Sequence, residues 1–261
     1  MNKNDVLFCI MNYKEKQNAE KLYKTISPWF PCHILDAESG EKPDAFGGDT
    51  IYLPNVFFGG LLQNAIELAQ EGHHRFLFFI CSDVVFPEEE FIKQKDILLA
   101  EEFSNVGVYC PSHQKDSYTF VKWPYNQATN KKRDVPCVEA MISMWNIRVC
   151  EHIHPCIENK YGWGLDICAA YYCLQNGFKQ MIDDRVSIYH PMGAVGKNEK
   201  ASIAAQLYFN SKPNANDINY LWQCIYANKD KVNVWWLRTK HFKFWNKLNR
   251  YLKKICKKCS L

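Results

Sequence analysis

The amino-acid sequence predicts an α/β fold with a mostly parallel sheet and helices on both faces. Between positions 6 and 80, apolar segments of strand length alternate with segments that carry apolar residues at helical spacing. The strand segments are continuous apolar runs rather than polar–apolar alternations, and the links between them are short. These three features are typical of a parallel sheet that helices cover on both sides.

The first half of the chain follows the order strand, helix, strand, helix, strand. The expected strands span 6–11, 32–35 and 76–80, and the expected helices span 14–26 and 57–70. Pro28 and Pro31 end the first helix, and Gly72 is the expected C-cap of the second. The turn-rich residues 40–50 are expected to form a loop.

The second half mixes strands with longer loops. Its expected strands span 106–110, 138–145, 179–183 and 186–189, and its expected helix spans 166–175. The polar stretch 112–136 is expected to be a mobile loop over the site. No clean linker interrupts the chain, so we expect one α/β domain over residues 1–195 and a helical extension over residues 196–261.

The composition is that of a folded protein from a reducing compartment. The chain has 261 residues, 47% of them hydrophobic, which is enough for one large domain with a well-filled core. Several of the 12 cysteines lie inside apolar runs, where a free thiol behaves as a small hydrophobe, and the opening MNKNDVLFCI lacks an apolar stretch of signal-peptide length. No apolar run approaches the roughly 20 residues of a membrane-spanning helix. We therefore expect a cytoplasmic location.

Positive charge is concentrated at the C-terminus. Residues 237–261 contain nine Lys or Arg and no acidic residue, so the chain's net charge of +4 leaves −5 for residues 1–236. Apolar residues of this tail fall three and four positions apart: Trp245, Leu248, Leu252 and Ile255. Such a basic amphipathic helix binds an anionic membrane surface, here the inner face of the cell membrane, and a solvated helix packed on its own domain is the alternative. Nucleic acid ranks low because the body is acidic.

Two carboxylates directly follow expected strands. Asp36 ends the second strand, and Asp83 follows the run FLFFICS after the third. In open parallel sheets ligands bind outside the carboxyl ends of the strands, so we expect both residues at the ligand edge. A lone carboxylate at this position is also typical of a turn or a helix N-cap, so Asp83 needs partners to indicate a site.

Two later segments provide such partners. In YGWGLD, two glycines flank Trp163 and leave its indole free to stack, and Asp166 follows. In YHPMG, His190 follows the last expected strand. Asp and His from separate strand ends suit Mn²⁺ or Mg²⁺ when a diphosphate completes the metal's shell. The alternatives are a helix-capping role for Asp166 and a structural role for His190.

The order of these segments resembles the GT-A glycosyltransferases, especially the family-2-like group. VLFCIMNYKEKQNAEKLYKTI is similar to their first strand and helix, and CHILDAESG to the second strand with its nucleotide-contacting Asp, here Asp36. NVFFGGLLQNAIELAQEGHHRFLFFICSDVVFP resembles a helix with an internal Asn, here Asn64, that runs into the DxD metal motif. Cys81 stands in place of the first Asp of that motif, so only Asp83 is present. YGWGLD resembles the acceptor-side turn, and VSIYHP the strand whose His completes the metal site. The resemblance covers residues 5–195.

The resemblance implies a metal-dependent glycosyltransferase. It implies that Asp83 and His190 hold Mn²⁺ or Mg²⁺, that Ser82 and Trp163 contact the sugar nucleotide, and that Asp166 is the base of an inverting reaction. The implied donor is a nucleotide sugar, foremost a uridine diphosphate sugar. The implied acceptor is a surface glycan or a lipid-linked sugar in bacterial polysaccharide biosynthesis.

Other functions stay open. A nucleotidyltransferase would need a glycine-rich basic loop after the first strand, and MNYKEKQ has no glycine. Cys81, in place of the first Asp of the motif, is consistent with a degenerate transferase that binds a nucleotide or glycan without turnover. A membrane-surface scaffold would act through residues 237–261 alone. Zinc could bind at four alternate positions only if they lay in an extended segment: Cys150, His152, His154 and Cys156.

Overall fold

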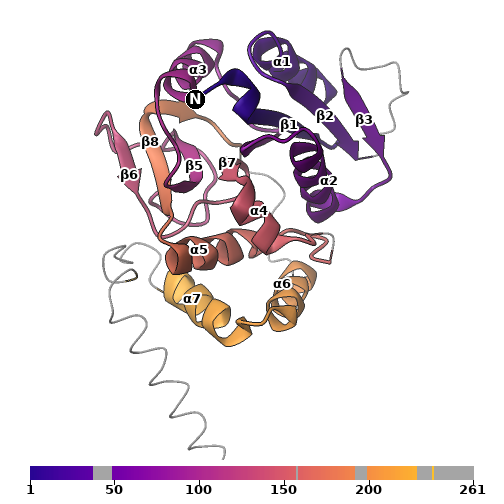
Figure 1. Cartoon of the computed structure of the whole chain (residues 1–261), viewed down its shortest axis with the longest axis vertical. Coiled ribbons are helices and arrows are strands. Elements are labelled where there is room, and N and C mark those ends of the chain that lie inside the picture. The colour runs from indigo at the N-terminus through magenta and orange to yellow at the C-terminus, as the bar shows by residue number, and fades with distance from the viewer. Residues whose placement is uncertain (38–48, 157, 192–198, 228–236, 238–261) are drawn as a thin grey trace, which may run out of the picture.

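The computed structural model describes residues 1–37, 49–156, 158–191, 199–227 and 237. An eight-stranded sheet runs through the molecule in the order β3-β2-β1-β4-β7-β5-β8-β6 (Figure 1). The strands are β1 (Val6–Asn12), β2 (Cys32–Ala37), β3 (Thr50–Leu53), β4 (Phe76–Cys81), β5 (Val106–His113), β6 (Lys132–Asp134), β7 (Ile142–Asn146) and β8 (Lys179–Ile188). The helices are η1 (Lys3–Asp5), α1 (Lys16–Ile26), α2 (Phe57–Glu71), α3 (Glu88–Ala100), α4 (Ile147–Ile153), α5 (Leu165–Asn176), α6 (Glu199–Ser211) and α7 (Ala215–Ala227).

The sheet is mixed, with parallel pairing in the majority. Strands β3, β2, β1 and β4 pair in parallel, and β5 pairs in parallel with β8. Strand β7 runs antiparallel between β4 and β5, and β6 is an antiparallel edge on β8. The amino end of β7 therefore lies at the same edge of the sheet as the carboxyl ends of β1, β2 and β4. The expected fold class is confirmed.

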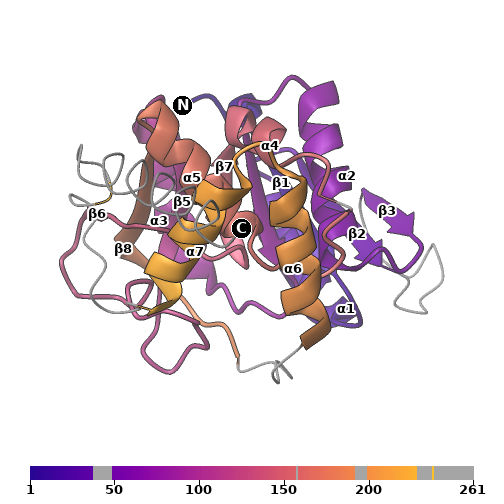
Figure 2. The same ribbon diagram turned by 90° about the horizontal axis from the view of Figure 1, so that it is seen from below.

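Helices cover both faces of the sheet. Helices α1 and α3 pack on one face, and α2, α4 and α5 pack on the other. Helix α7 packs on α5, and α6 packs on α7, so the two helices form an additional layer on that side (Figure 2). Buried aromatic side chains fill the core between these layers, where neighbouring strands place Phe8 and Phe78 ring to ring at 4.6 Å.

Two strands escaped the sequence analysis. Strand β3 extends the sheet beyond β2 and is only partly buried, and β6 consists of Lys132, Arg133 and Asp134. Both are edge strands, which expose one side to solvent and so lack the continuous apolar run of a central strand. Strand β6 is held by an ion pair from Arg133 to Asp184, whose carboxylate is fully buried.

Other boundaries differ from the expected ones. The strand expected over 138–145 begins only at Ile142, and the strands expected over 179–183 and 186–189 form one strand with an irregular register against β5. The expected boundary near residue 195 lies outside the described residues, as does the basic tail apart from the buried Leu237. No helix in the described part of the chain is long and apolar enough to cross a bilayer.

Candidate functional site

The chain folds so that Asp83 and His190 meet at the carboxyl edge of the sheet. Val85, just after β4, and Tyr189, just after β8, form an antiparallel bridge with N···O distances of 2.8 and 3.1 Å. This bridge places His190 Nε2 3.4 Å from Asp83 Oδ2. The two residues are 107 positions apart in sequence, so the bridge supplies a contact that neither segment could make alone.

The Asp83 carboxylate has one oxygen that the described protein leaves unsatisfied. Asp83 Oδ1 is buried and has no hydrogen-bond partner among the described residues. An orphaned carboxylate oxygen in a buried position costs free energy unless a cation or a ligand occupies it. A cation bound at Asp83 would therefore give this buried oxygen the partner that it lacks.

His190 is held in a fixed orientation beside this oxygen. The side chain is buried, its backbone N–H donates to Ser117 Oγ at 3.1 Å, and its Nδ1 lies 3.4 Å from the Tyr118 carbonyl oxygen. A proton on Nδ1 that points at this carbonyl leaves the lone pair of Nε2 free on the Asp83 side. Neighbouring His113 is buried, and burial lowers the pKa of its imidazole to about 3, so it stays neutral.

Asn18 fixes the backbone around Asp83. Its side-chain amide donates to the carbonyl oxygens of Ser82 at 2.5 Å and Val84 at 2.9 Å. These two carbonyls flank Asp83, so one side chain from α1 holds both ends of the residue that would bind a cation. The Ser82 backbone N–H also donates to Met11 O at 2.9 Å, which ties the same loop to the end of β1.

A first cavity of about 370 Å³ opens at the ends of β1, β2 and β4. Met11 and Ala37 line it from the first two strands, and Cys81, Ser82 and Asp83 line it from the third. The remaining wall comes from the start of α2 and from the loops before it and after β1: Tyr13, Glu15, Asn55, Phe57, Phe58 and Leu61. Ligands of open parallel sheets bind outside the strand ends, and we name this the donor cavity after the role proposed for it below.

Two residues expected to contact a nucleotide are hydrogen-bonded to other groups of the protein. The Asp36 carboxylate is buried and accepts a hydrogen bond from Asn12 Nδ2 at 2.6 Å. Asn64 donates from its side chain to the carbonyl of Gly60 at 2.9 Å, within its own helix. The described lining of the donor cavity includes neither residue, so their direct contact with a nucleotide stays a prediction.

A second cavity of about 300 Å³ shares Phe58, Cys81 and Asp83 with the first. It is lined by Trp163, Asp166 and His190, and by aromatic side chains from three further segments of the chain. Tyr118 and Phe120 come from the stretch expected to lie over the site, and this placement agrees with the expectation, although the mobility of the stretch stays a prediction. We name this the acceptor cavity, after the role proposed for it below.

The turn that carries Trp163 depends on two glycines. Gly162 and Gly164 hold φ angles of +74° and +83°, which only glycine adopts at little cost. A Cβ on Gly162 would lie 2.2 Å from the ring of Phe58, so the turn also packs too closely for a side chain. Asn159 Nδ2 donates a hydrogen bond to the Trp163 carbonyl oxygen at 2.7 Å, which stabilises the turn.

Asp166 is poised to exchange a proton near neutral pH. Burial raises the pKa of its carboxyl from the usual range to about 6, although the Ile167 N–H donates to Oδ1 at 2.9 Å. A carboxylate with such a pKa can act as a general base at physiological pH. Glu139 lines the same cavity and accepts hydrogen bonds from the N–H groups of Phe120 at 2.8 Å and Val121 at 2.9 Å.

The two cavities are acidic. Their described lining includes four carboxylates, from Glu15, Asp83, Glu139 and Asp166, and no Lys or Arg. A diphosphate placed here would be repelled in the absence of a neutralising cation. The protein groups positioned to hold one are Asp83 and His190. No group of three or more His, Cys, Asp or Glu side chains in the described residues has the arrangement of a metal site.

Two protein ligands, Asp83 and His190, are enough for a hard divalent ion. Mg²⁺ and Mn²⁺ keep several waters and bind through one or two carboxylates together with the phosphates of a substrate. By contrast, the four residues considered for zinc do not share one extended segment. Cys150 and His152 lie within helix α4, and His154 and Cys156 follow it.

Comparison with known proteins shows the fold. No protein-family model and no curated protein matches the sequence. The crystal structure of GalNAc-T7 with UDP, GalNAc and Mn²⁺ is similar at a TM-score of 0.58 and 9% identity over 93% of this chain, which spans 54% of that chain. The fold is thus an α/β fold similar to that of a GT-A glycosyltransferase.

Two further structures are similar at a lower level. A197 from STIV matches at 14% identity over 74% of this chain and 87% of its own. A mannose-1-phosphate geranyltransferase from Thermus thermophilus matches at 11% identity over 72% of this chain and 75% of its own. Both have a TM-score of 0.43, which is too low to bear on the fold.

Several residues of the site were missed from the sequence. Asn12, Asn18 and Glu139 act through hydrogen bonds to groups that lie 18 to 66 positions away, and no local pattern marks such contacts. Tyr226 of α7 reaches the acceptor cavity and contacts the ring of Phe120 at 4.4 Å. Only the amphipathic spacing of α7 could have indicated that this helix packs on the domain.

Proposed function

We propose that this protein is a metal-dependent glycosyltransferase, which moves a sugar from a nucleoside diphosphate donor to a hydroxyl acceptor. One observation carries the proposal. The Asp83–His190 pair, with an unsatisfied carboxylate oxygen, lies where the donor and acceptor cavities meet. A diphosphate held there would present the sugar to the second cavity.

The donor half of the proposal assigns the nucleotide to the cavity at the strand ends. Ser82 and Asp83 face it from the end of β4, and aromatic rings of Tyr13, Phe57 and Phe58 offer flat surfaces for a base. A uridine diphosphate sugar is the favoured donor, since the similar GalNAc-T7 structure was determined with UDP and GalNAc. The acidic lining favours a donor that arrives with a divalent cation.

Asp83 and His190 would hold that cation, which is Mn²⁺ or Mg²⁺ in this proposal. When bound, it would neutralise the negative charge that builds on the leaving diphosphate. The protein supplies few ligands, so donor phosphates and water would complete the coordination. Mn²⁺ in the similar GalNAc-T7 structure supports the choice of ion.

The acceptor half of the proposal assigns the base to Asp166. Asp166 takes the proton of an acceptor hydroxyl while the hydroxyl oxygen bonds to the anomeric carbon, and the nucleoside diphosphate leaves with the electrons of the broken bond. This is a single displacement with inversion. Trp163 offers its indole to the face of the acceptor or donor sugar.

The acceptor and the cellular location are part of the same proposal. A surface glycan or lipid-linked sugar as acceptor, and attachment to the inner face of a bacterial membrane, rest on the basic amphipathic pattern of residues 237–261. In this proposal residues 1–195 form the transferase domain, and residues 196–261 form the extension that carries the tail.

A binding protein without turnover is the second candidate, favoured by Cys81 at the position of the first Asp of the metal motif. Cys81 faces both cavities, and its burial raises the pKa of its thiol, so it stays neutral and cannot replace a carboxylate. In this alternative the protein binds a sugar nucleotide and releases it unchanged.

Donor hydrolysis separates the two candidates. The purified protein is incubated with a panel of sugar nucleotides, with Mn²⁺ or with chelator, and the released nucleoside diphosphate is measured. We expect slow hydrolysis of one donor that needs metal and is lost in Asp83→Ala. Binding of nucleotide without any release, also in the presence of candidate acceptors, would favour the binding protein. If the protein neither binds a sugar nucleotide nor releases nucleoside diphosphate from one, both candidates are refuted.

A further inference from the structure

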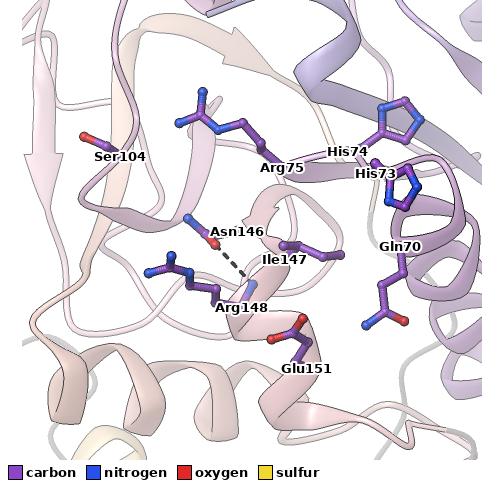
Figure 3. Close-up of a pocket in the computed structure, with 9 residues that line it drawn as sticks. All are labelled: Gln70, His73, His74, Arg75, Ser104, Asn146, Ile147, Arg148 and Glu151. Atoms are coloured by element: carbon purple, nitrogen blue, oxygen red, sulfur yellow. Dashed lines mark hydrogen bonds between the residues drawn. The ribbon is translucent and has the colours of Figure 1, made fainter.

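A third cavity lies at the opposite edge of the sheet from the proposed site (Figure 3). Its volume is about 700 Å³. Arg75 directly precedes β4, Asn146 ends the antiparallel strand β7, and Ser104 lies just before β5, so all three belong to the edge where the parallel strands begin. Asp83 follows the other end of β4, which at about 3.3 Å per residue puts roughly 20 Å between the two sites. We name this cavity the far cleft.

The lining of the far cleft is basic, in contrast to the acidic donor and acceptor cavities. Arg75, Arg148, His73 and His74 line it, and Glu151 is the single acidic side chain among its described lining residues. Residues 1–236 have a net charge of −5, so this basic cluster lies on a part of the chain that is acidic as a whole. A concave basic surface on an acidic body concentrates anions.

The two arginines keep most of their hydrogen-bonding capacity free for a ligand. Arg75 reaches Asp5 at 3.4 Å, an exposed and long ion pair. The Arg148 guanidinium has no hydrogen bond or ion pair to any described residue, and its side chain is exposed. Figure 3 shows both arginine side chains extending toward the side of the cleft where Ser104 lies. Two guanidinium groups that line one cleft are suited to binding a phosphate.

The other wall of the cleft is polar and locally strained. His73 holds a φ angle of +53°, in the left-handed region that is uncommon for residues with a side chain. Helix ends usually place glycine in this conformation, yet here Gly72 keeps a negative φ and the next residue, a histidine, takes the strained position. This conformation places the imidazole ring of His73 at the wall of the far cleft, beside Gln70.

We propose that the far cleft binds a small phosphate ester, such as a nucleotide or a sugar phosphate, at a site separate from the proposed catalytic centre. Arg75, Arg148 and Ser104 hold the phosphate group, and the wall of Gln70 and His73 receives the rest of the molecule. The volume is within the usual range of small-molecule sites, which is about 300 to 1,000 Å³, and exceeds what a bare phosphate needs. This proposal does not rest on the proposed transferase activity.

Calorimetry on the full chain in chelator tests the proposal. Chelator removes metal-dependent binding at Asp83, and the variants described below assign the remaining heat to the far cleft. Three probes are titrated: pyrophosphate, adenosine monophosphate and glucose 6-phosphate. We expect saturable binding of at least one ester, and its Kd identifies whether the nucleotide or the sugar phosphate is preferred. Binding of pyrophosphate alone, with neither ester, would overturn the assignment of a phosphate ester.

Three variants locate the binding. Arg148→Gln removes a guanidinium without a protein partner among the described residues, so the fold is expected to be unchanged and the Kd to rise by at least about tenfold, the effect of losing one charge-assisted contact. Asp83→Asn should keep the affinity of the parent protein. Lys21→Gln removes an exposed cation from α1 and is the matched charge control. Saturable binding that Arg148→Gln leaves unchanged, or no binding at all, would overturn the proposal.

Discussion

The donor and acceptor cavities are built in different ways from the same sheet. All described lining residues of the donor cavity lie between Met11 and Asp83, on three parallel strands, one helix and their short links. The acceptor cavity draws on segments from Phe58 to Tyr226, including the turn at Trp163 and the last helix described. Parallel strand register thus fixes the first cavity, whereas contacts between distant segments fix the second. Donor binding should therefore tolerate changes that abolish acceptor use.

The largest expected effect separates the two cavities at Asp166. Asp166→Asn should lower the rate of sugar transfer by about 10²- to 10⁴-fold, because a general base is lost, and leave donor binding unchanged. In the parent protein the rate should rise as the pH rises through about 6, since the Asp166 carboxyl must lose its proton to act as a base. Steady-state rates over pH 5 to 8 measure both effects.

Asp116→Asn is the matched control for that variant, since Asp116 is an exposed carboxylate on the neighbouring loop that lines neither cavity. Its rate and pH profile should equal those of the parent protein. A transfer rate that survives Asp166→Asn would remove Asp166 from the mechanism and leave Glu139 as the other carboxylate in the acceptor cavity.

Asn18 tests how far the donor cavity depends on one side chain. Asn18→Ala removes the two hydrogen bonds that flank Asp83 and should weaken metal binding by about 10- to 100-fold, as loss of an outer-sphere partner usually does. Gln17→Ala, at the exposed neighbouring position on α1, should have no such effect. Equal Mn²⁺ affinities for both variants, measured by calorimetry in the presence of UDP, would show that Asn18 does not position Asp83.

The pH dependence of the free energy of unfolding also tests the raised pKa of Asp166. The carboxyl has a pKa of about 6 in the folded protein, above its value in the unfolded chain, so the ionised form destabilises the fold above pH 6 and the cost vanishes below about pH 4. Asp166→Asn should therefore raise the free energy of unfolding by about 3 kcal/mol at pH 8, but not at pH 4. Urea unfolding at the two pH values measures this, and a loss of stability at pH 8 would contradict the assignment of a raised pKa.

The smallest expected effect concerns the stacking surface. Trp163→Leu keeps an apolar side chain but loses the flat ring, so the KM for the acceptor should rise by up to about tenfold, the worth of one aromatic contact. The affinity for the intact sugar-nucleotide donor with Mn²⁺ should not change, because Trp163 does not line the donor cavity. A matching loss of donor affinity would mean that the indole stacks on the donor sugar instead.

The difference between the cavities also explains what the sequence could predict. Strands β1, β2 and β4 carry continuous apolar runs, so both the parallel sheet and the position of Asp83 at its edge were predictable. The pairing of Asp83 with His190 was expected from their places after separate strands, where Asp and His suit a divalent ion, and from the family resemblance. The bridge between Val85 and Tyr189, which creates that pairing, leaves no local pattern in the sequence.

The parts that sequence analysis missed share a physical cause. Strands β3 and β6 lie at sheet edges and are short and partly polar, so they lack a periodic apolar signal. The roles of Asn18 and Glu139 depend on backbone groups that folding brings near, and Asp36 accepts a hydrogen bond from Asn12. Long-range hydrogen bonds of this kind appear only in the folded chain.

The central claim is that Asp83 and His190 hold a divalent cation where the two cavities meet. Titration of Mn²⁺ into the protein in the presence of UDP, by calorimetry, tests it most directly when the parent protein is compared with Asp83→Asn and Asp116→Asn. The account predicts saturable binding to the parent and to Asp116→Asn, and a loss of at least about tenfold in affinity for Asp83→Asn. Equal affinities for all three proteins, or no binding to the parent, would contradict it.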